Sequence, residues 1–466
     1  MTNIQDTICA IATAQGGAIG IIRISGPEAI SITDRIFTPA GNNPAPLKER
    51  VPYTLSFGQI KNTSGEIVDE VLISLFRAPH SYTGEDSVEI SCHGSAYILQ
   101  QVMQLLIKNG CRAAGPGEYT QRAFLNGKMD LSQAEAVADL IASSSAATHR
   151  LAMNQMKGGF SKELSMLRDK LLHLTSLMEL ELDFSDHEEL EFADRSELKD
   201  IAGQIERVIG GLVQSFSVGN AIKNGIPVAI IGETNAGKST LLNALLNEER
   251  AIVSDIHGTT RDVIEDTMNI GGVTFRFIDT AGIRDTSDTI ESLGIERSFQ
   301  KLGQADIVLW VIDSSETRTE YKKLAGKILP KCEGKQLILV LNKADLTKES
   351  GSFPTEELPV NAWVISISAK EKTGIDKLQH LLLKAADIPE ISQSNVIVAN
   401  VRHYEALSKA LEAIHRVQEG MDMGLSGDLV SQDLRECLFH LAEIVGGEIT
   451  TDEVLGNIFK HFCIGK

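Results

Sequence analysis

The sequence is poor in cysteine and in aromatic residues. None of its six cysteines forms a Cys-x-x-Cys pair, so their spacing fits neither a zinc site nor the disulfide framework of a secreted protein. Aromatic residues make up 5% of the chain, which argues against a broad platform for stacking nucleic-acid bases. These two absences favour an ordinary protein of a reducing compartment.

Long apolar runs and a basic leader are also absent. The first residues, MTNIQDTICAIAT, contain no basic region followed by an apolar run, so we expect no signal peptide. No apolar run approaches the roughly 20 residues of a membrane-spanning helix. We therefore expect a cytoplasmic protein that has no membrane as a partner.

Positive charge is scarce relative to negative charge. Lys and Arg number 44 against 63 Asp and Glu, which gives a net charge of −19. This balance excludes a protein that coats nucleic acid through a general basic field, but it leaves room for a local patch or for recognition through a partner. Apolar residues make up 42% of the chain, enough for packed cores, and at about 150 residues per domain the 466 residues suggest roughly three domains.

The hydrophobic pattern changes three times along the chain. Residues 1–120 alternate short β-rich runs with turns, and residues 121–218 are almost entirely helical in pattern. Residues 219–388 repeat an apolar strand followed by a segment long enough for a helix, which is typical of a doubly wound parallel sheet. Helical spacing returns in residues 389–466. We predict a multi-domain α+β and α/β protein, in which an α/β domain interrupts one helical bundle.

A glycine-rich loop at residues 232–239 predicts a phosphate-binding site. The segment GETNAGKS follows the apolar strand PVAII and precedes the helical run TLLNALL, which is the context that a P-loop requires. Backbone N–H groups of such a loop point at phosphates, Lys238 would hold the β- and γ-phosphates, and the Ser239 hydroxyl would bind Mg²⁺. The predicted nucleotide contacts in this segment are Asn235, Ala236, Gly237, Lys238, Ser239 and Thr240.

Three further motifs end apolar strands and identify the nucleotide as GTP. DTAG at 279–282 places a carboxylate near the metal and a glycine N–H near the γ-phosphate. NKAD at 342–345 ends in a carboxylate that can accept both donors of guanine, a pair that adenine lacks, and SAK at 368–370 stands where a base-contacting loop belongs. These motifs predict a Ras-like P-loop GTPase domain. Their predicted contacts are Asp279, Thr280, Ala281, Gly282, Asn342, Lys343, Asp345, Ser368, Ala369 and Lys370.

The switch regions of the predicted GTPase carry unusual residues. In Ras-like GTPases the residue after the DTAG-type glycine is often a glutamine that orients water, but here it is Ile283. Another group must therefore orient the attacking water. Upstream, Thr259 and Thr260 lie where the first switch is expected, and Thr260 is the better candidate ligand for Mg²⁺.

Over its full length the chain resembles the MnmE (TrmE) family of tRNA wobble-uridine modification GTPases. Besides the GTPase motifs, the resemblance rests on PGEYTQRAFLNGKMDLSQAEAVADLI at 116–141 and on the final residues FCIGK. It implies an N-terminal folate-binding and dimerisation domain, a helical domain made from two segments, and a GTPase domain inserted between them. The last implication agrees with the hydrophobic pattern.

The resemblance implies K⁺-dependent hydrolysis that is activated when two GTPase domains meet across the nucleotide. K⁺ placed against the phosphates would act electrostatically, as an arginine finger does elsewhere. In the family a glutamate beyond the DTAG motif orients the water, and its match here is Glu291. We therefore expect Glu291 and Lys238 to be the catalytic residues. The implied K⁺ ligands, which also belong to the nucleotide site, are Asn235, Ser254, Ile256 and Thr259.

The resemblance also implies a site for a reduced folate, 5-formyl- or methylene-tetrahydrofolate. A carboxylate such as Glu89 suits the adjacent N–H donors of a pterin, and Arg23 and Lys128 suit the glutamate tail or a formyl oxygen. The C-terminal Lys466 completes the implied set. Cys463, between two apolar neighbours, is either a nucleophile near the folate or a small buried residue.

The family context implies partners and a product. A homodimer would join an MnmG-type FAD-containing protein in a heterotetramer or larger complex, with tRNA as the substrate. The complex would build an aminomethyl or carboxymethylaminomethyl group at carbon 5 of the wobble uridine, while GTP hydrolysis drives a conformational cycle. Two alternatives are a GTP-regulated ribosome-assembly factor and a folate-dependent one-carbon enzyme whose nucleotide domain is a passive sensor.

Overall fold

The computed structural model describes most of the chain and divides it into two compact units. The first unit comprises residues 1–142, 153–209 and 406–466, and the second comprises residues 143–152 and 210–405. The described residues are 6–14, 16–41, 45–183, 195–233, 235–249, 266–278, 302–314, 325–326, 328–346, 358–359, 362–388, 396–447, 455, 458–460 and 462–465.

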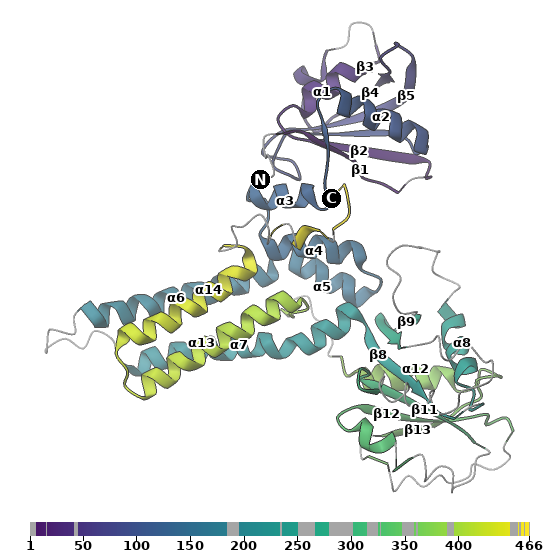
Figure 1. Cartoon of the computed structure of the whole chain (residues 1–466), viewed down its shortest axis with the longest axis vertical. Coiled ribbons are helices and arrows are strands. Elements are labelled where there is room, and N and C mark those ends of the chain that lie inside the picture. The colour runs from purple at the N-terminus through teal and green to yellow at the C-terminus, as the bar shows by residue number, and fades with distance from the viewer. Residues whose placement is uncertain are drawn as a thin grey trace. The chain divides into compact units, whose positions relative to one another are not determined.

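The N-terminal part of the first unit is a seven-stranded sheet. Its strands are β1 (Ile8–Ile11), β2 (Ile19–Ser25), β3 (Phe37–Pro39), β4 (Leu55–Lys61), β5 (Ile67–Phe76), β6 (Ser87–His93) and β7 (Arg112–Ala113). They lie in the order β3-β4-β5-β6-β2-β1-β7 (Figure 1). Neighbouring strands are antiparallel except β1 and β7, which are parallel.

Helices α1 (Ala29–Ile36) and α2 (Ala96–Lys108) pack against one face of this sheet. Successive residues of a strand point to opposite faces, so β5 buries alternate side chains, among them Val71 and Ile73. Leu99 of α2 belongs to the same buried cluster. A short 3₁₀ helix, η1 (Leu47–Glu49), connects β3 to β4. The α+β domain predicted for the first part of the chain is therefore confirmed.

A buried ion-pair network joins helix α3 (Glu118–Leu125) to this domain. The Arg122 side chain is 4% exposed and contacts carboxylate oxygens of Asp6 at 2.5 Å, Glu85 at 3.2 Å and Glu118 at 3.0 Å. A buried charge is costly unless it is paired, and this arginine has three carboxylate partners. The network therefore fixes α3 against the segment before β1 and the loop before β6.

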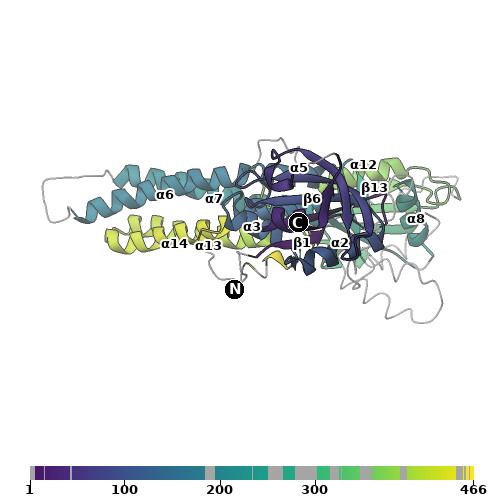
Figure 2. The same cartoon turned by 90° about the horizontal axis from the view of Figure 1, so that it is seen from above.

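The helical region of the first unit combines segments that are far apart in the sequence. α6 and α14 lie side by side (Figures 1 and 2). Leu167 and Leu171 are buried on α6, and Leu434 and Leu441 are buried on α14, as the three- and four-residue spacing predicts. Besides α1, α2 and α3, the helices that lie wholly or partly in this unit are α4 (Leu131–Ala142), α5 (Ala146–Met156), α6 (Gly159–Asp183), α7 (Arg195–Asn224), α13 (Val401–Asp422) and α14 (Gly427–Val445).

The second unit contains a six-stranded, mostly parallel sheet. Its strands and helices are β8 (Ile226–Ile231), α8 (Lys238–Glu249), β9 (Asp266–Ile270), β10 (Val273–Phe277), β11 (Ile307–Asp313), η2 (Leu329–Cys332), β12 (Gln336–Asn342), β13 (Trp363–Ser366) and α12 (Ile375–Ala386). The strand order is β13-β12-β11-β8-β10-β9, and only β9 is antiparallel to its neighbour. This is the doubly wound α/β arrangement that the sequence predicts.

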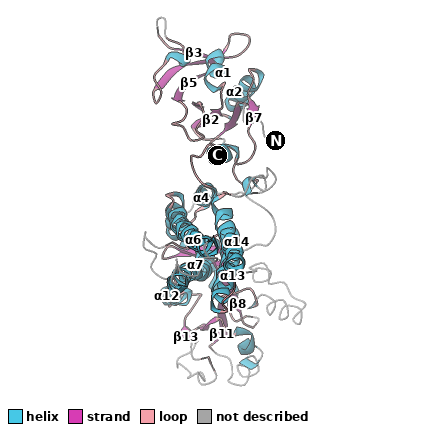
Figure 3. Ribbon diagram, turned by 90° about the vertical axis from the view of Figure 1, so that its left-hand side faces the viewer, coloured by secondary structure: helices cyan, strands magenta, loops and turns pink. Residues whose placement is uncertain are grey.

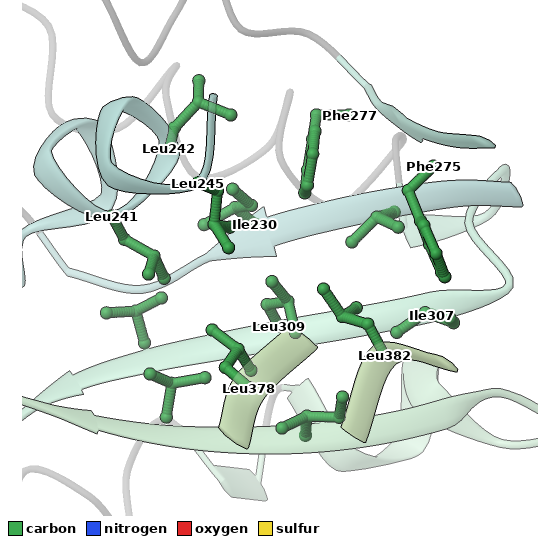
Figure 4. Close-up of a cluster of buried hydrophobic side chains, with 14 of the residues drawn as sticks. Ile230, Leu241, Leu242, Leu245, Phe275, Phe277, Ile307, Leu309, Leu378 and Leu382 are labelled. Atoms are coloured by element: carbon green, nitrogen blue, oxygen red, sulfur yellow. The ribbon is translucent and has the colours of Figure 1, made fainter. Parts of the chain in front are cut away.

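Apolar side chains cover both faces of the central strand β11. Figure 4 shows Leu309 on one face, near Leu241 of α8 and Leu378 of α12. The next residue of the strand, Trp310, points to the opposite face and belongs to a second buried cluster, which also contains Leu339 of β12. Because β11 is covered on both faces, neither face of the strand is polar. This explains why its sequence is a continuous apolar run.

The predicted fold class is confirmed by the distribution of helices and strands (Figure 3). Strands form the N-terminal sheet and the sheet of the inserted domain, and long helices occur both before and after that insertion. No helix within the described ranges has both the length and the apolar character needed to span a membrane.

Candidate functional site

The predicted phosphate loop lies between the end of β8 and the start of α8. Gly232 has a φ of 152°, and a Cβ atom there would lie 2.1 Å from the carbonyl oxygen of Val311. Gly237 has a φ of 93°, and its Cβ would lie 2.2 Å from Nδ2 of Asn342. Both positions require glycine for backbone conformation and for space. The loop therefore has the strand–loop–helix context that a phosphate cradle needs.

Lys238, the first residue of α8, reaches back to the loop. Its Nζ donates to the carbonyl oxygen of Gly232 at 2.7 Å and to that of Glu233 at 2.6 Å. Burial lowers the pKa of Lys238, and the Glu233 carboxylate partly opposes this effect. The ammonium is thus held by two neutral carbonyl acceptors. A charged phosphate oxygen can take their place, because its hydrogen bond to the ammonium is stronger.

Asn342, at the C-terminal end of β12, joins three of the predicted motifs. Its Nδ2 donates to the carbonyl oxygen of Ala236 at 2.9 Å, and its Oδ1 accepts the N–H of Ala369 at 3.0 Å. The side chain is buried, so both hydrogen bonds are shielded from water. The structure therefore brings together the phosphate loop, the NKAD motif and the SAK loop around one asparagine.

The predicted guanine acceptor, Asp345, is fixed by the SAK loop. The Ser368 hydroxyl donates to Oδ1 of Asp345 at 2.6 Å and accepts the N–H of Glu371 at 3.2 Å. A backbone bridge between Ser368 and Thr373 closes this loop, and Lys370 within it is exposed. A carboxylate has about four lone-pair sites, so Asp345 can still accept the two N–H donors of a guanine base.

Lys343 is held by Asp313, a residue that the sequence analysis did not single out. Nζ of Lys343 donates to Oδ2 of Asp313 at 2.6 Å. Asp313 ends β11 and lies opposite Asn342 in the β11–β12 register. Its position could have indicated it, because Asp313 ends the apolar run DIVLWVID just as the NKAD motif comes at the end of the next strand.

The described ligands of the expected ions lie next to the phosphate loop. Ser239, the predicted Mg²⁺ ligand, is in the first turn of α8, next to the predicted nucleotide contact Thr240. Asn235, a predicted K⁺ ligand, is exposed in the loop with a φ of 68°. A serine hydroxyl and an asparagine amide are oxygen donors of the kind that Mg²⁺ and K⁺ bind, so these residue types fit the two ions. Within the described ranges, no group of three or more His, Cys, Asp or Glu residues is arranged to hold a metal.

The remaining predicted residues of the nucleotide site, and one of the folate site, lie outside the described residues. They include both switch regions, the DTAG motif, the candidate that orients water and the C-terminal lysine. They are Ser254, Ile256, Thr259, Thr260, Asp279, Thr280, Ala281, Gly282, Glu291 and Lys466.

A second cluster forms around Arg23 on the N-terminal sheet. Arg23 and Glu89 are opposite each other in the β2–β6 register, and Nε and Nη2 of Arg23 contact Oε1 of Glu89 at 2.9 and 2.8 Å. Nη1 of Arg23 donates to the carbonyl oxygen of Gly465 at 3.2 Å. The cluster therefore joins two of the predicted folate residues to the residue that precedes Lys466.

Two tyrosines that were not among the predicted site residues flank the Arg23 guanidinium. Its Cζ lies 5.6 Å from the ring centroid of Tyr82 and 5.7 Å from that of Tyr119, within the range of cation–π attraction. The Tyr119 hydroxyl donates to the carbonyl oxygen of Arg23 at 2.7 Å, and burial raises the pKa of both tyrosines. Tyr119 is part of the PGEYT motif, whereas no sequence signal marked Tyr82.

Lys128 lies against the loop that carries Tyr82. Its Nζ donates to the carbonyl oxygen of Pro79 at 2.9 Å, and a Cβ added at Gly84 would lie 3.3 Å from its Cγ. Lys128 and Arg23 therefore contact the same loop, 79–84.

Cys463 is exposed, so its interpretation as a small buried residue is wrong. The carbonyl oxygen of Cys463 accepts the N–H of Gly117 at 3.3 Å, and Ile464 pairs with Pro116 in an antiparallel bridge. A Cβ at Gly117 would lie 2.8 Å from Cβ of Phe462. The C-terminal segment is therefore held by its backbone and by close packing on a glycine, and not by burial of the thiol.

Comparison with known proteins identifies the family of the chain. The model described as "GTP-binding protein TrmE N-terminus" matches residues 7–128, and the model "MnmE helical domain" matches residues 131–463. Relatives called "tRNA modification GTPase MnmE" include one from Bacteroides thetaiotaomicron and one from Bacteroides fragilis. Each is 70% identical to this chain over 467 residues, and the alignment covers 99% of this chain and 100% of the relative. A third, from Parabacteroides distasonis, is 65% identical over 466 residues with the same coverage. The chain therefore belongs to the MnmE (TrmE) family.

Proposed function

We propose that this chain, a GTP-hydrolysing enzyme of tRNA modification, acts with an MnmG-type FAD-containing partner and a reduced folate on the tRNA wobble uridine. The product would carry an aminomethyl or carboxymethylaminomethyl group at carbon 5. One observation carries the proposal. The chain has two separate clusters: the Asn342 side chain joins three nucleotide motifs by hydrogen bonds, and Arg23 pairs with Glu89 on the N-terminal sheet. Identity of 70% over the full length to relatives named tRNA modification GTPase supports it.

In the proposed nucleotide site, each group has a separate task. The loop N–H groups and Lys238 bind the phosphates, and Asp345 accepts the two N–H donors of guanine. Ser239 and Thr260 would supply hydroxyl ligands to Mg²⁺, which neutralises phosphate charge when it is bound. Glu291 would orient the attacking water, since the side chain of Ile283 has no group that can hold it.

Hydrolysis is expected to be several-fold faster in K⁺ than in Na⁺ at equal ionic strength. The proposed ligands Asn235, Ser254, Ile256 and Thr259 would hold K⁺ at the phosphates, where added positive charge stabilises the transition state. Phosphate release from GTP, measured in KCl and in NaCl at the same Mg²⁺ concentration, tests this. Asn235→Ala should reduce the difference between the salts. Equal wild-type rates in the two salts would remove the K⁺ assignment and leave the GTPase.

Substitution of Glu89 by glutamine is expected to weaken binding of 5-formyltetrahydrofolate by about 10-fold or more. The carboxylate would accept N–H donors of the pterin, and hydrogen bonds to charged groups contribute about 1.5–3 kcal/mol. Glu89 also pairs with Arg23, so the variant releases that guanidinium as well. Isothermal titration with the folate measures the change. Glu70→Gln, at an exposed position of β5, is the matched control. Unchanged affinity in Glu89→Gln would refute the role of Glu89.

The partners and the domain organisation follow the family pattern in our proposal. The chain would form a homodimer that assembles with the MnmG-type protein, and the complex would work in the cytoplasm. We propose boundaries at 1–120, 121–218, 219–388 and 389–466 for the N-terminal, first helical, GTPase and second helical segments. The exposed Cys463 would be available for chemistry near the folate.

Mass spectrometry of tRNA nucleosides tests the proposed function as a whole. Loss of the gene in the source organism is expected to remove the carbon-5 group from wobble uridine, and the wild-type gene is expected to restore it. A gene that carries Lys238→Ala is expected not to restore it. That result would exclude the alternative in which the nucleotide domain is only a passive sensor. A nucleoside profile that does not change on deletion would contradict the proposal and favour a ribosome-assembly factor, which ribosome profiles would then reveal.

A further inference from the structure

Asp313 and Lys343 form an ion pair where the nucleotide motifs meet. Their side chains are 17% and 31% exposed, and the Nζ–Oδ2 distance is 2.6 Å. Exposed ion pairs contribute little because water screens them and because both side chains lose freedom. A short pair with one largely buried carboxylate is better shielded, so it can hold a lysine in one place.

The backbone on both sides of this pair is fixed by other contacts. Asp313 lies opposite Asn342 in the β11–β12 register, and Ser314 donates both its N–H, at 2.9 Å, and its hydroxyl to the carbonyl oxygen of Asn342. Lys343 follows with a φ of 64°, a conformation that residues other than glycine seldom adopt. Such a conformation persists only where its surroundings hold it, and it often marks a functional position.

Lys343 lies in the chain between two residues of the proposed nucleotide site, Asn342 and Asp345. Asn342, which precedes it, contacts the phosphate loop at Ala236, and Asp345, two residues further on, is the proposed guanine acceptor held by Ser368. The four-carbon stem of a lysine can cover the flat face of a purine, provided that its ammonium has a polar partner elsewhere. Asp313 supplies that partner at the end of the neighbouring strand.

We infer that Asp313 is a positioning residue for guanine nucleotides, which holds the ammonium of Lys343 so that the lysine stem covers the base. The inference rests on the proposed GTP site. A lysine without this anchor samples many rotamers, and ordering it when the nucleotide binds reduces affinity. Asp313 orders the lysine in the free protein, so this part of the entropy is lost before binding. The effect is on binding of the base and not on phosphate chemistry, which involves Lys238.

A double-mutant cycle between the two residues tests the inference. Asp313→Asn, Lys343→Ala and the double variant are compared with wild type by titration with GDP and by steady-state hydrolysis of GTP. Asp387→Asn is the control, because it removes one negative charge from an exposed residue of the same domain whose φ of 43° suits asparagine. Thermal unfolding of each variant confirms that the titrated protein is folded.

Asp313→Asn is expected to weaken GDP binding by about 10-fold, which is about 1.4 kcal/mol. The KM for GTP should rise by a similar factor while kcat stays within about twofold of wild type. The double variant should bind GDP no more weakly than Lys343→Ala alone, since Asp313 acts through the lysine.

Three results would overturn the inference. Losses that add in the double variant would mean that Asp313 acts independently of Lys343. If Asp313→Asn bound GDP within twofold of wild type, the ion pair would have no role in binding. Unchanged GDP affinity in Lys343→Ala would lead to the same conclusion, even if Asp313→Asn did not fold. A wild-type chain that binds no guanine nucleotide is a distinct failure, because it removes the proposed GTP site itself.

Discussion

GTP hydrolysis is expected to fall by about 100- to 1,000-fold when Lys238 is replaced by alanine. Removing a preorganised donor from a site of developing negative charge typically has an effect of this size. Nζ of Lys238 is within hydrogen-bond distance of two loop carbonyl oxygens, so it is already positioned at the phosphate loop before the nucleotide binds. Single-turnover release of phosphate from saturating GTP in K⁺ measures the change in the chemical step.

The control for this prediction is Lys377→Ala, which removes an exposed lysine from α12 in the same domain. Its turnover should equal that of wild type. If Lys238→Ala retained turnover within about threefold of wild type, the loop would not be the catalytic phosphate site. The resemblance of this segment to a P-loop would then reflect structure alone.

Replacement of Asp345 by asparagine is expected to change the preferred nucleotide from GTP to XTP. Guanine presents two N–H donors to the carboxylate, whereas xanthine presents one donor and one carbonyl acceptor, which match the oxygen and the NH₂ of an asparagine amide. A site built for two donors rejects a mismatched base strongly, so kcat/KM for GTP should fall by at least about 100-fold. The Ser368 hydroxyl, 2.6 Å from Oδ1 of Asp345, can still donate to an amide oxygen.

The measurement is kcat/KM for GTP and for XTP with the wild type and the variant. The exchange predicts a gain for XTP as well as a loss for GTP. A loss for GTP with no gain for XTP would indicate that Asp345 supports the fold and does not read the base. Asp376→Asn, an exposed acidic residue in the first turn of α12, should leave both values unchanged.

The local structure of the proposed nucleotide site was predictable from the sequence. The phosphate loop is a short contiguous segment between a strand and a helix, and its glycines are required by positive φ angles and close backbone contacts at the same positions. Asn342, Asp345 and Ser368 were also predicted, because each lies at or just beyond the end of an apolar strand and the carboxyl ends of parallel strands meet at one edge of a sheet. The structure adds how they are joined, through the two hydrogen bonds of the Asn342 side chain.

The N-terminal cluster was less predictable because its members are far apart in the sequence. Arg23 and Glu89 were named only through the family resemblance, and without it each reads as a surface charge. Their contact depends on the register between β2 and β6, and the contact with Gly465 joins residues 442 positions apart. Tyr82 flanks Arg23 from a loop that carries no recognisable motif.

The sequence alone predicts the chemistry of this chain, because the residues proposed to bind phosphate and to read guanine stand in ordered motifs whose local conformation follows from their own composition. It also determines the two-part helical region, since hydrophobic spacing reports which face of a helix is buried. Only the tertiary structure decides which distant groups meet. Strand register brings Arg23 to Glu89 and Asp313 to Lys343, and docking of the C-terminal backbone leaves Cys463 exposed. Register and docking depend on packing between segments far apart in the chain, and no single segment contains that information.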